Sequence, residues 1–297
     1  MFSCFDDDGM STGIYQRKTS FFHHIFPKCV EDNIMTYVTR PLTLESKWRY
    51  DAWSNGILHT SVTTDGKIHV FSRWGLTDVN IFNKSGERQK NFKASSELHH
   101  LNQAIRCHNV MWTHMNTYSS IYIWNADSGE VIRSIDLPSM PSVEVSFAFA
   151  GGYVLIVCDD GKFYLFREDG TFLRSFVANS SHVFEFFAFN GTEIFVSCCE
   201  TKRVQVYDLN GNLIRSIGKF KNIYSVAVYN KKVFVIGVRD DDTFEQILYV
   251  FSVNGRLLTH FSFEADTIKP ALVILSSGHI LIRDMLTIRI YKPVCDD

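Results

Sequence analysis

Apolar and polar residues alternate in short runs along most of the chain from Ile57 onward. A period of two is typical of strands with one face buried, and no segment after Ile57 carries the 3.6-residue stripe of an amphipathic helix. The runs come in pairs separated by a polar turn, as in residues 57–72 and 223–237. The pattern therefore predicts an all-β chain built from hairpins.

The hairpins recur at intervals of 40 to 44 residues, measured between aromatic residues that end equivalent strands. Apolar residues stand two positions apart just before each aromatic anchor, as Val204 and Val206 do before Tyr207. Each repeat has room for four strands. The six anchors are Phe82, Trp124, Phe166, Tyr207, Phe251 and Tyr291.

A glycine follows five of the six anchors, and an apolar residue stands six positions beyond each glycine. Glycine tolerates the positive φ that a tight turn between antiparallel strands requires. This fixed spacing indicates a fourth strand after each turn. The glycines are Gly86, Gly129, Gly170, Gly211 and Gly255.

A four-stranded unit of this size has two apolar faces, and radial packing against neighbours buries both of them, as in a β-propeller. We expect six blades in residues 46–297, the last closed by an N-terminal strand at Lys47–Trp53. The alternative is seven blades, with Phe21–Leu44 as a degenerate blade. Residues 1–45 are expected to be irregular or packed on the propeller, and their aromatic Ser20–Phe26 stretch could instead anchor a partner.

The segment Lys202–Asp208 (Lys-Arg-Val-Gln-Val-Tyr-Asp), followed by Gly211 and Arg215, resembles an NHL repeat. NHL repeats are WD40-like propeller units, although the Gly-His pair and terminal Trp-Asp of WD40 repeats occur in no copy here. The resemblance is specific in this blade and generic in the others. It implies a platform for proteins or RNA, with enzymes as a minority of relatives, and it transfers no catalytic residue.

The composition bears on location and partners. The net charge of −2 gives no overall attraction to nucleic acid or anionic membrane. The N-terminus lacks a signal-peptide pattern, no apolar run is long enough for a membrane span, and the seven cysteines do not suggest a disulfide framework. We expect a soluble, monomeric, intracellular protein of the cytoplasm or nucleus.

No motif for catalysis, for a metal or for a cofactor is evident. The chain has neither a Gly-x-Ser-x-Gly elbow nor a glycine-rich phosphate loop, and the histidines near Cys29 and Cys107 lack the paired spacing of zinc ligands. A pair of carboxylates inside the central channel stays open, because spacing along the chain does not give their separation.

The loops after the second and fourth strand of each blade are the candidate binding surface, because repeat architecture leaves them free to vary. Exposed aromatic and cationic residues supply most binding energy at interfaces. The sequence thus predicts a non-enzymatic scaffold for protein partners; the alternatives are single-stranded RNA binding by the same face and a channel-mouth lyase or hydrolase. The candidate contact residues are Trp74, His114, Tyr118, Lys202, Arg203, Lys221 and Arg239.

A basic residue also recurs on the predicted outermost strand, where a charge discourages edge-to-edge aggregation. We assign it a structural role. The residues are Lys90, Arg133, Arg174 and Arg215.

Overall fold

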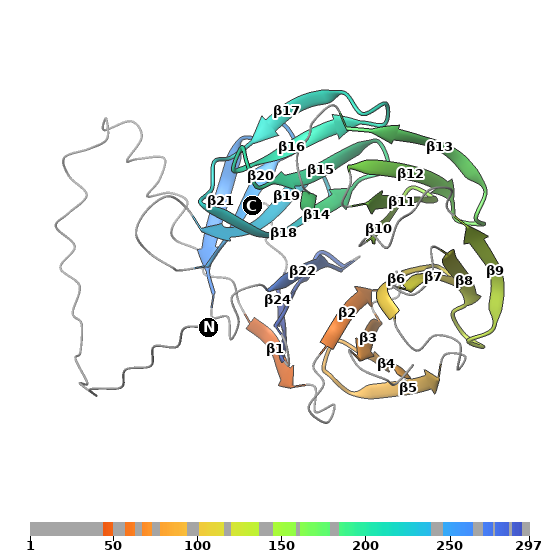
Figure 1. Ribbon diagram of the computed structural model, residues 1–297. Coiled ribbons are helices and arrows are strands. Elements are labelled where there is room, and N and C mark those ends of the chain that lie inside the picture. The colour runs from red at the N-terminus through yellow and green to blue at the C-terminus, as the bar shows by residue number, and fades with distance from the viewer. Residues whose placement is uncertain are drawn as a thin grey trace, which may run out of the picture. The chain divides into compact units, whose positions relative to one another are not determined.

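The computed structural model describes thirteen stretches of the chain: residues 44–49, 57–62, 67–72, 78–93, 101–115, 120–136, 145–158, 161–178, 184–238, 246–263, 270–275, 277–284 and 287–292. These stretches form six four-stranded antiparallel sheets and contain no helix. None of them therefore holds a helix that could cross a membrane. The sheets follow one another around a centre as the blades of a β-propeller, which confirms the predicted all-β fold and its six blades (Figure 1).

Five blades use four strands that are consecutive in the chain, ordered from the innermost to the outermost. Blade 1 has β2 (Ile57–Val62), β3 (Ile68–Ser72), β4 (Asp78–Phe82) and β5 (Arg88–Lys93). Blade 2 has β6 (Leu101–Cys107), β7 (Val110–Met115), β8 (Ser120–Asn125) and β9 (Val131–Asp136). Blade 3 has β10 (Val145–Ala150), β11 (Tyr153–Cys158), β12 (Lys162–Arg167) and β13 (Phe172–Val177).

Blade 4 has β14 (Phe184–Phe189), β15 (Glu193–Cys198), β16 (Arg203–Asp208) and β17 (Leu213–Ile217). Blade 5 has β18 (Asn222–Tyr229), β19 (Lys232–Val238), β20 (Ile247–Ser252) and β21 (Leu257–Ser262). Blade 6 has β22 (Ala271–Ile274), β23 (Ile280–Arg283) and β24 (Thr287–Tyr291), and β1 (Leu44–Arg49) is its outermost strand.

The aromatic anchor of a blade packs toward the preceding blade, and its two apolar neighbours pack toward the next one. Tyr207 lies in the core shared with blade 3, whereas Val204 and Val206 lie in the core shared with blade 5. Phe251 and Tyr291 repeat this arrangement toward blades 4 and 5. Alternation along the third strand therefore serves two different interfaces, which explains why both of its faces are apolar.

The ring closes through the N-terminal strand β1, as expected, but at a different place in the sequence. The closing strand is Leu44–Arg49 and not Lys47–Trp53, and it pairs antiparallel with β24, Leu44 opposite Tyr291. Residues 51–53 lie outside the described stretches. The closing strand starts earlier than expected because Leu44, and not Lys47, lies opposite the anchor Tyr291.

Three of the four recurring basic residues on the outermost strands, Lys90, Arg174 and Arg215, join their blade to the next one. Lys90 Nζ donates to the carbonyl of Asp127 at 3.3 Å, and Arg174 donates to Asn210 Oδ1 at 2.9 Å. Each acceptor lies in the turn before the outermost strand of the following blade. In β1, Ser46 stands at the same register and donates to the carbonyl of Lys84 at 2.7 Å. We call these contacts the outer latches.

Candidate functional site

Antiparallel strands place the loops of the propeller at two ends. The loops between second and third strands and the connections between blades share one end, which we call the connector face; the remaining turns form the turn face. The four candidate contact residues that the structure describes, His114, Lys202, Arg203 and Lys221, belong to or border loops of the connector face. Trp74, Tyr118 and Arg239 lie outside the described stretches, so their predicted role stays a prediction.

His114 lies near the end of β7, but its side chain is inside the blade. Only 3% of the residue is exposed, and among the described residues its Nδ1 has no hydrogen-bond partner. Burial lowers the pKa of the imidazole, so the neutral ring is favoured. A ring in this position cannot contact a docked partner, and we leave it out of the binding face. The prediction placed His114 in a loop, whereas it lies in β7, one residue before the end of the strand.

Lys202, Arg203 and Lys221 are brought together by hydrogen bonds between neighbouring loops. The Phe220 amide donates to the carbonyl of Lys202 at 2.8 Å, and the Lys221 amide donates to the carbonyl of Val238 at 2.7 Å. These bonds join the β15–β16 loop to the β17–β18 connection and to the end of β19. The three predicted residues therefore belong to one continuous and backbone-fixed surface.

The buried Phe220 ring fixes the loop that carries this surface. The residue is 2% exposed, and its ring meets those of Tyr249 and Phe251 edge-on at centroid distances of 5.4 and 6.0 Å. Gly218, at φ 64°, is packed so closely that a Cβ there would lie 2.5 Å from the Phe220 ring. The ring holds the chain so that the lysines on either side of Phe220 point outward.

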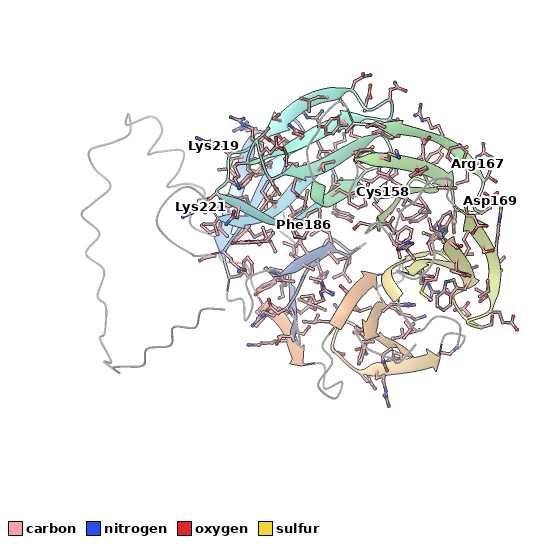
Figure 2. The ribbon with its side chains drawn as sticks, viewed as in Figure 1. Cys158, Arg167, Asp169, Phe186, Lys219 and Lys221 are labelled. Carbon is pink, nitrogen blue, oxygen red and sulfur yellow. The ribbon has the colours of Figure 1, made fainter. Side chains whose placement is uncertain are left out.

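Lys219 is the residue that the candidate contact set lacked. Figure 2 shows Lys219 and Lys221 projecting from the margin of the molecule beside β18, whereas Phe186 lies toward the centre. Both lysines are exposed, as are Lys202 and Arg203. We call these four residues the basic loop cluster. The signal for Lys219 is the Lys-Phe-Lys pattern, in which one buried ring exposes the residue on each side.

The backbone at Lys202 is strained. Its φ is 56°, a left-handed conformation that L side chains adopt at a cost of about 1–2 kcal/mol. Gly161 is the equivalent residue of blade 3, with φ 79°, and its carbonyl likewise accepts a bond from the next connection, at Ala178. Blade 4 thus has a lysine where the same turn of blade 3 has a glycine.

The centre of the propeller contains a cavity of about 390 Å³ between the innermost strands. Its walls carry mainly aromatic and aliphatic side chains, among them Phe147, Phe149, Phe186 and Phe187, and its polar groups include Ser225 and Arg283. The Ser225 hydroxyl already accepts the amide of Leu272 at 3.1 Å. The described part of the wall therefore exposes polar and apolar surface in similar measure.

The described stretches offer little support for metal binding or for a reactive thiol. They contain no group of three or more His, Cys, Asp or Glu residues arranged to hold a metal ion. Cys107, Cys158 and Cys198 are buried. Burial, together with the nearby Glu168 carboxylate, raises the pKa of Cys107 well above its ordinary value, which disfavours the reactive thiolate.

Comparison with known proteins gives a likeness of fold. No family model matches the sequence, and no curated protein matches it. Among solved structures, the chain is similar to Hsv2 of Kluyvelomyces marxianus, with a TM-score of 0.52 and 13% identity over 77% of this chain and 73% of that one. At this identity the likeness concerns architecture alone: the chain has the fold of a six-bladed β-propeller.

Proposed function

We propose that the protein is a non-enzymatic, intracellular scaffold that binds protein partners through its connector face. The observation that carries the proposal is the basic loop cluster, in which four exposed cationic residues are presented by loops fixed through main-chain hydrogen bonds. A binding surface that is ordered before the partner arrives avoids part of the entropic cost of association.

The rest of the described structure is consistent with this role. Apolar cores join blade 2 to blade 3, blade 3 to blade 4 and blade 4 to blade 5, so these blades form one packed support. Cys107, Cys158 and Cys198 are buried, which supports a binding function inside the cell more than chemistry by a reactive thiol. The likeness to a solved propeller supports the fold alone.

The proposal is tested by affinity capture from cell lysate, with bound proteins identified by mass spectrometry. Single replacement of Arg203 or of Lys221 by alanine is expected to reduce recovery of specific partners. Lys231, which is exposed on the turn face, is the matched control for loss of one positive charge. Equal recovery by the connector-face and turn-face variants would contradict the placement. A companion variant at Trp74 and Arg239 tests the predicted residues outside the described stretches.

A further inference from the structure

We infer that the basic loop cluster binds an acidic peptide segment, a run rich in Asp and Glu, of a partner protein. The inference rests on the proposed scaffold function and names the chemistry that the partner presents. Four cationic residues, Lys202, Arg203, Lys219 and Lys221, lie on two loops joined by the bond between Phe220 and Lys202.

The cluster differs in charge from the molecule as a whole. Glu200 is the acidic residue within the same two loops, so cations outnumber anions there by four to one. The complete chain carries a net charge of −2. A local positive surface on a nearly neutral protein attracts a complementary acidic segment and repels basic ones, which gives orientation and selectivity more than affinity.

The loops hold their charges in a fixed arrangement. Phe220 is buried between the two exposed lysines, and Gly218 and Gly237 allow the chain to approach its ring closely. Thr201 and Lys202 both donate main-chain bonds to Cys198, to its sulfur at 3.4 Å and its carbonyl at 3.0 Å. Binding then has to order side chains only, because the backbone is already in place.

An acidic peptide fits this surface better than single-stranded RNA does. RNA-binding faces combine cations with exposed aromatic rings on which bases stack. The aromatic residue within these loops is Phe220, and its ring is buried against Tyr249 and Phe251. The described loops thus offer charges for carboxylates but no platform for a base.

The test measures fluorescence anisotropy of the full chain with three labelled probes: a Glu-rich peptide, the same peptide with Gln for Glu, and oligouridine. We expect binding of the Glu peptide that weakens as salt rises, and weak or absent binding of the other two. Lys202→Gly should lower affinity roughly two- to fivefold, the range for one exposed ion pair, and combination with Lys221→Ser should lower it further.

Lys231→Gly is the matched control. Lys231 is also exposed and also has a positive φ, 59°, but it lies in the turn between β18 and β19 on the turn face. Both glycine variants relieve strain and remove one charge, so both should unfold at the same or a higher temperature than the parent protein. Only Lys202→Gly should weaken peptide binding.

Three results would overturn the inference: no binding of the Glu peptide, equal loss in the two glycine variants, or tighter binding of oligouridine than of the peptide. Failure here is separable from failure of the scaffold proposal. If lysate partners are still lost on replacement of Arg203 or of Lys221 while the Glu peptide does not bind, the connector face binds proteins by other chemistry. If neither is affected by the cluster variants, both proposals are wrong.

Discussion

Arg215 of β17 donates from Nε to the carbonyl of Val253, which lies in the turn of the following blade, at a distance of 2.7 Å. The other end of its guanidinium forms two hydrogen bonds with the Glu193 carboxylate, at 2.6 and 2.8 Å. Arg215 thus ties its own blade to the next and is held in position by its own blade. The basic residue predicted to protect a strand edge also links neighbouring blades.

Loss of the Arg215 latch should destabilise the ring. Arg215→Met keeps much of the aliphatic contact but removes the bonds to Val253 and Glu193. Because both side chains of the ion pair are only about a quarter exposed, we expect a loss of about 1–2 kcal/mol in the free energy of unfolding. Chemical denaturation measures it. Arg174→Met, which breaks one exposed bond to Asn210, is the control, and an equal loss there would contradict the special role of Arg215.

Substitution of turn glycines should separate backbone strain from steric clash. At Gly211, φ is 84° and a Cβ would lie 2.7 Å from the carbonyl oxygen of Val177 in the preceding blade. At Gly152, φ is 77° and a Cβ would meet nothing within 4 Å. Gly152→Ala should therefore cost about 1 kcal/mol, and Gly211→Ala about 2–4 kcal/mol. Similar decreases in melting temperature for the two variants would show that the close approach between blades at Gly211 does not affect stability.

The buried ion pair between Asp284 and Arg289 should be sensitive to loss of one partner. Their side chains are 1% and 2% exposed, and burial lowers the pKa of the neighbouring Arg283 to about 10. Asp284→Asn leaves Arg289 without that carboxylate in a poorly solvated place, at an expected cost of about 3–5 kcal/mol. The double variant Asp284→Leu, Arg289→Met should recover much of this loss. A double variant no more stable than the single one would count against the pairing.

The stability of the protein should fall as pH drops through the ordinary range of histidine titration, and His114 should contribute. Burial lowers the pKa of His114 in the folded state, so the unfolded chain binds the proton more readily. Stability from this group is complete above the unfolded pKa of about 6.5 and is lost as pH falls below it. His114→Leu should flatten the dependence of unfolding free energy between about pH 7.5 and 5.5. An unchanged slope in the variant would rule out this contribution.

The number and order of blades were predictable because every repeat obeys the same packing rule. An anchor such as Tyr207 and its neighbours Val204 and Val206 must face two different blades, and that requirement is visible as a fixed spacing. The position of β1 was missed by three residues, since a closing strand has no turn glycine to mark its register. Side-chain direction was the other gap: the sequence places His114 beside a loop, but only the packing of β7 shows that its ring is buried.

The pairing of Leu44 with Tyr291 also has a consequence for synthesis. Blades 1 to 5 form from neighbouring hairpins, and each can assemble as its own residues leave the ribosome. Blade 6 must wait, because its outermost strand is made early and the strand it pairs with is made late. Until then β1 has no partner strand, and the apolar core between blades 6 and 1 is incomplete. A nascent chain of this protein therefore presents an open edge from the synthesis of β1 until that of β24, and chaperone contact is expected to concentrate there.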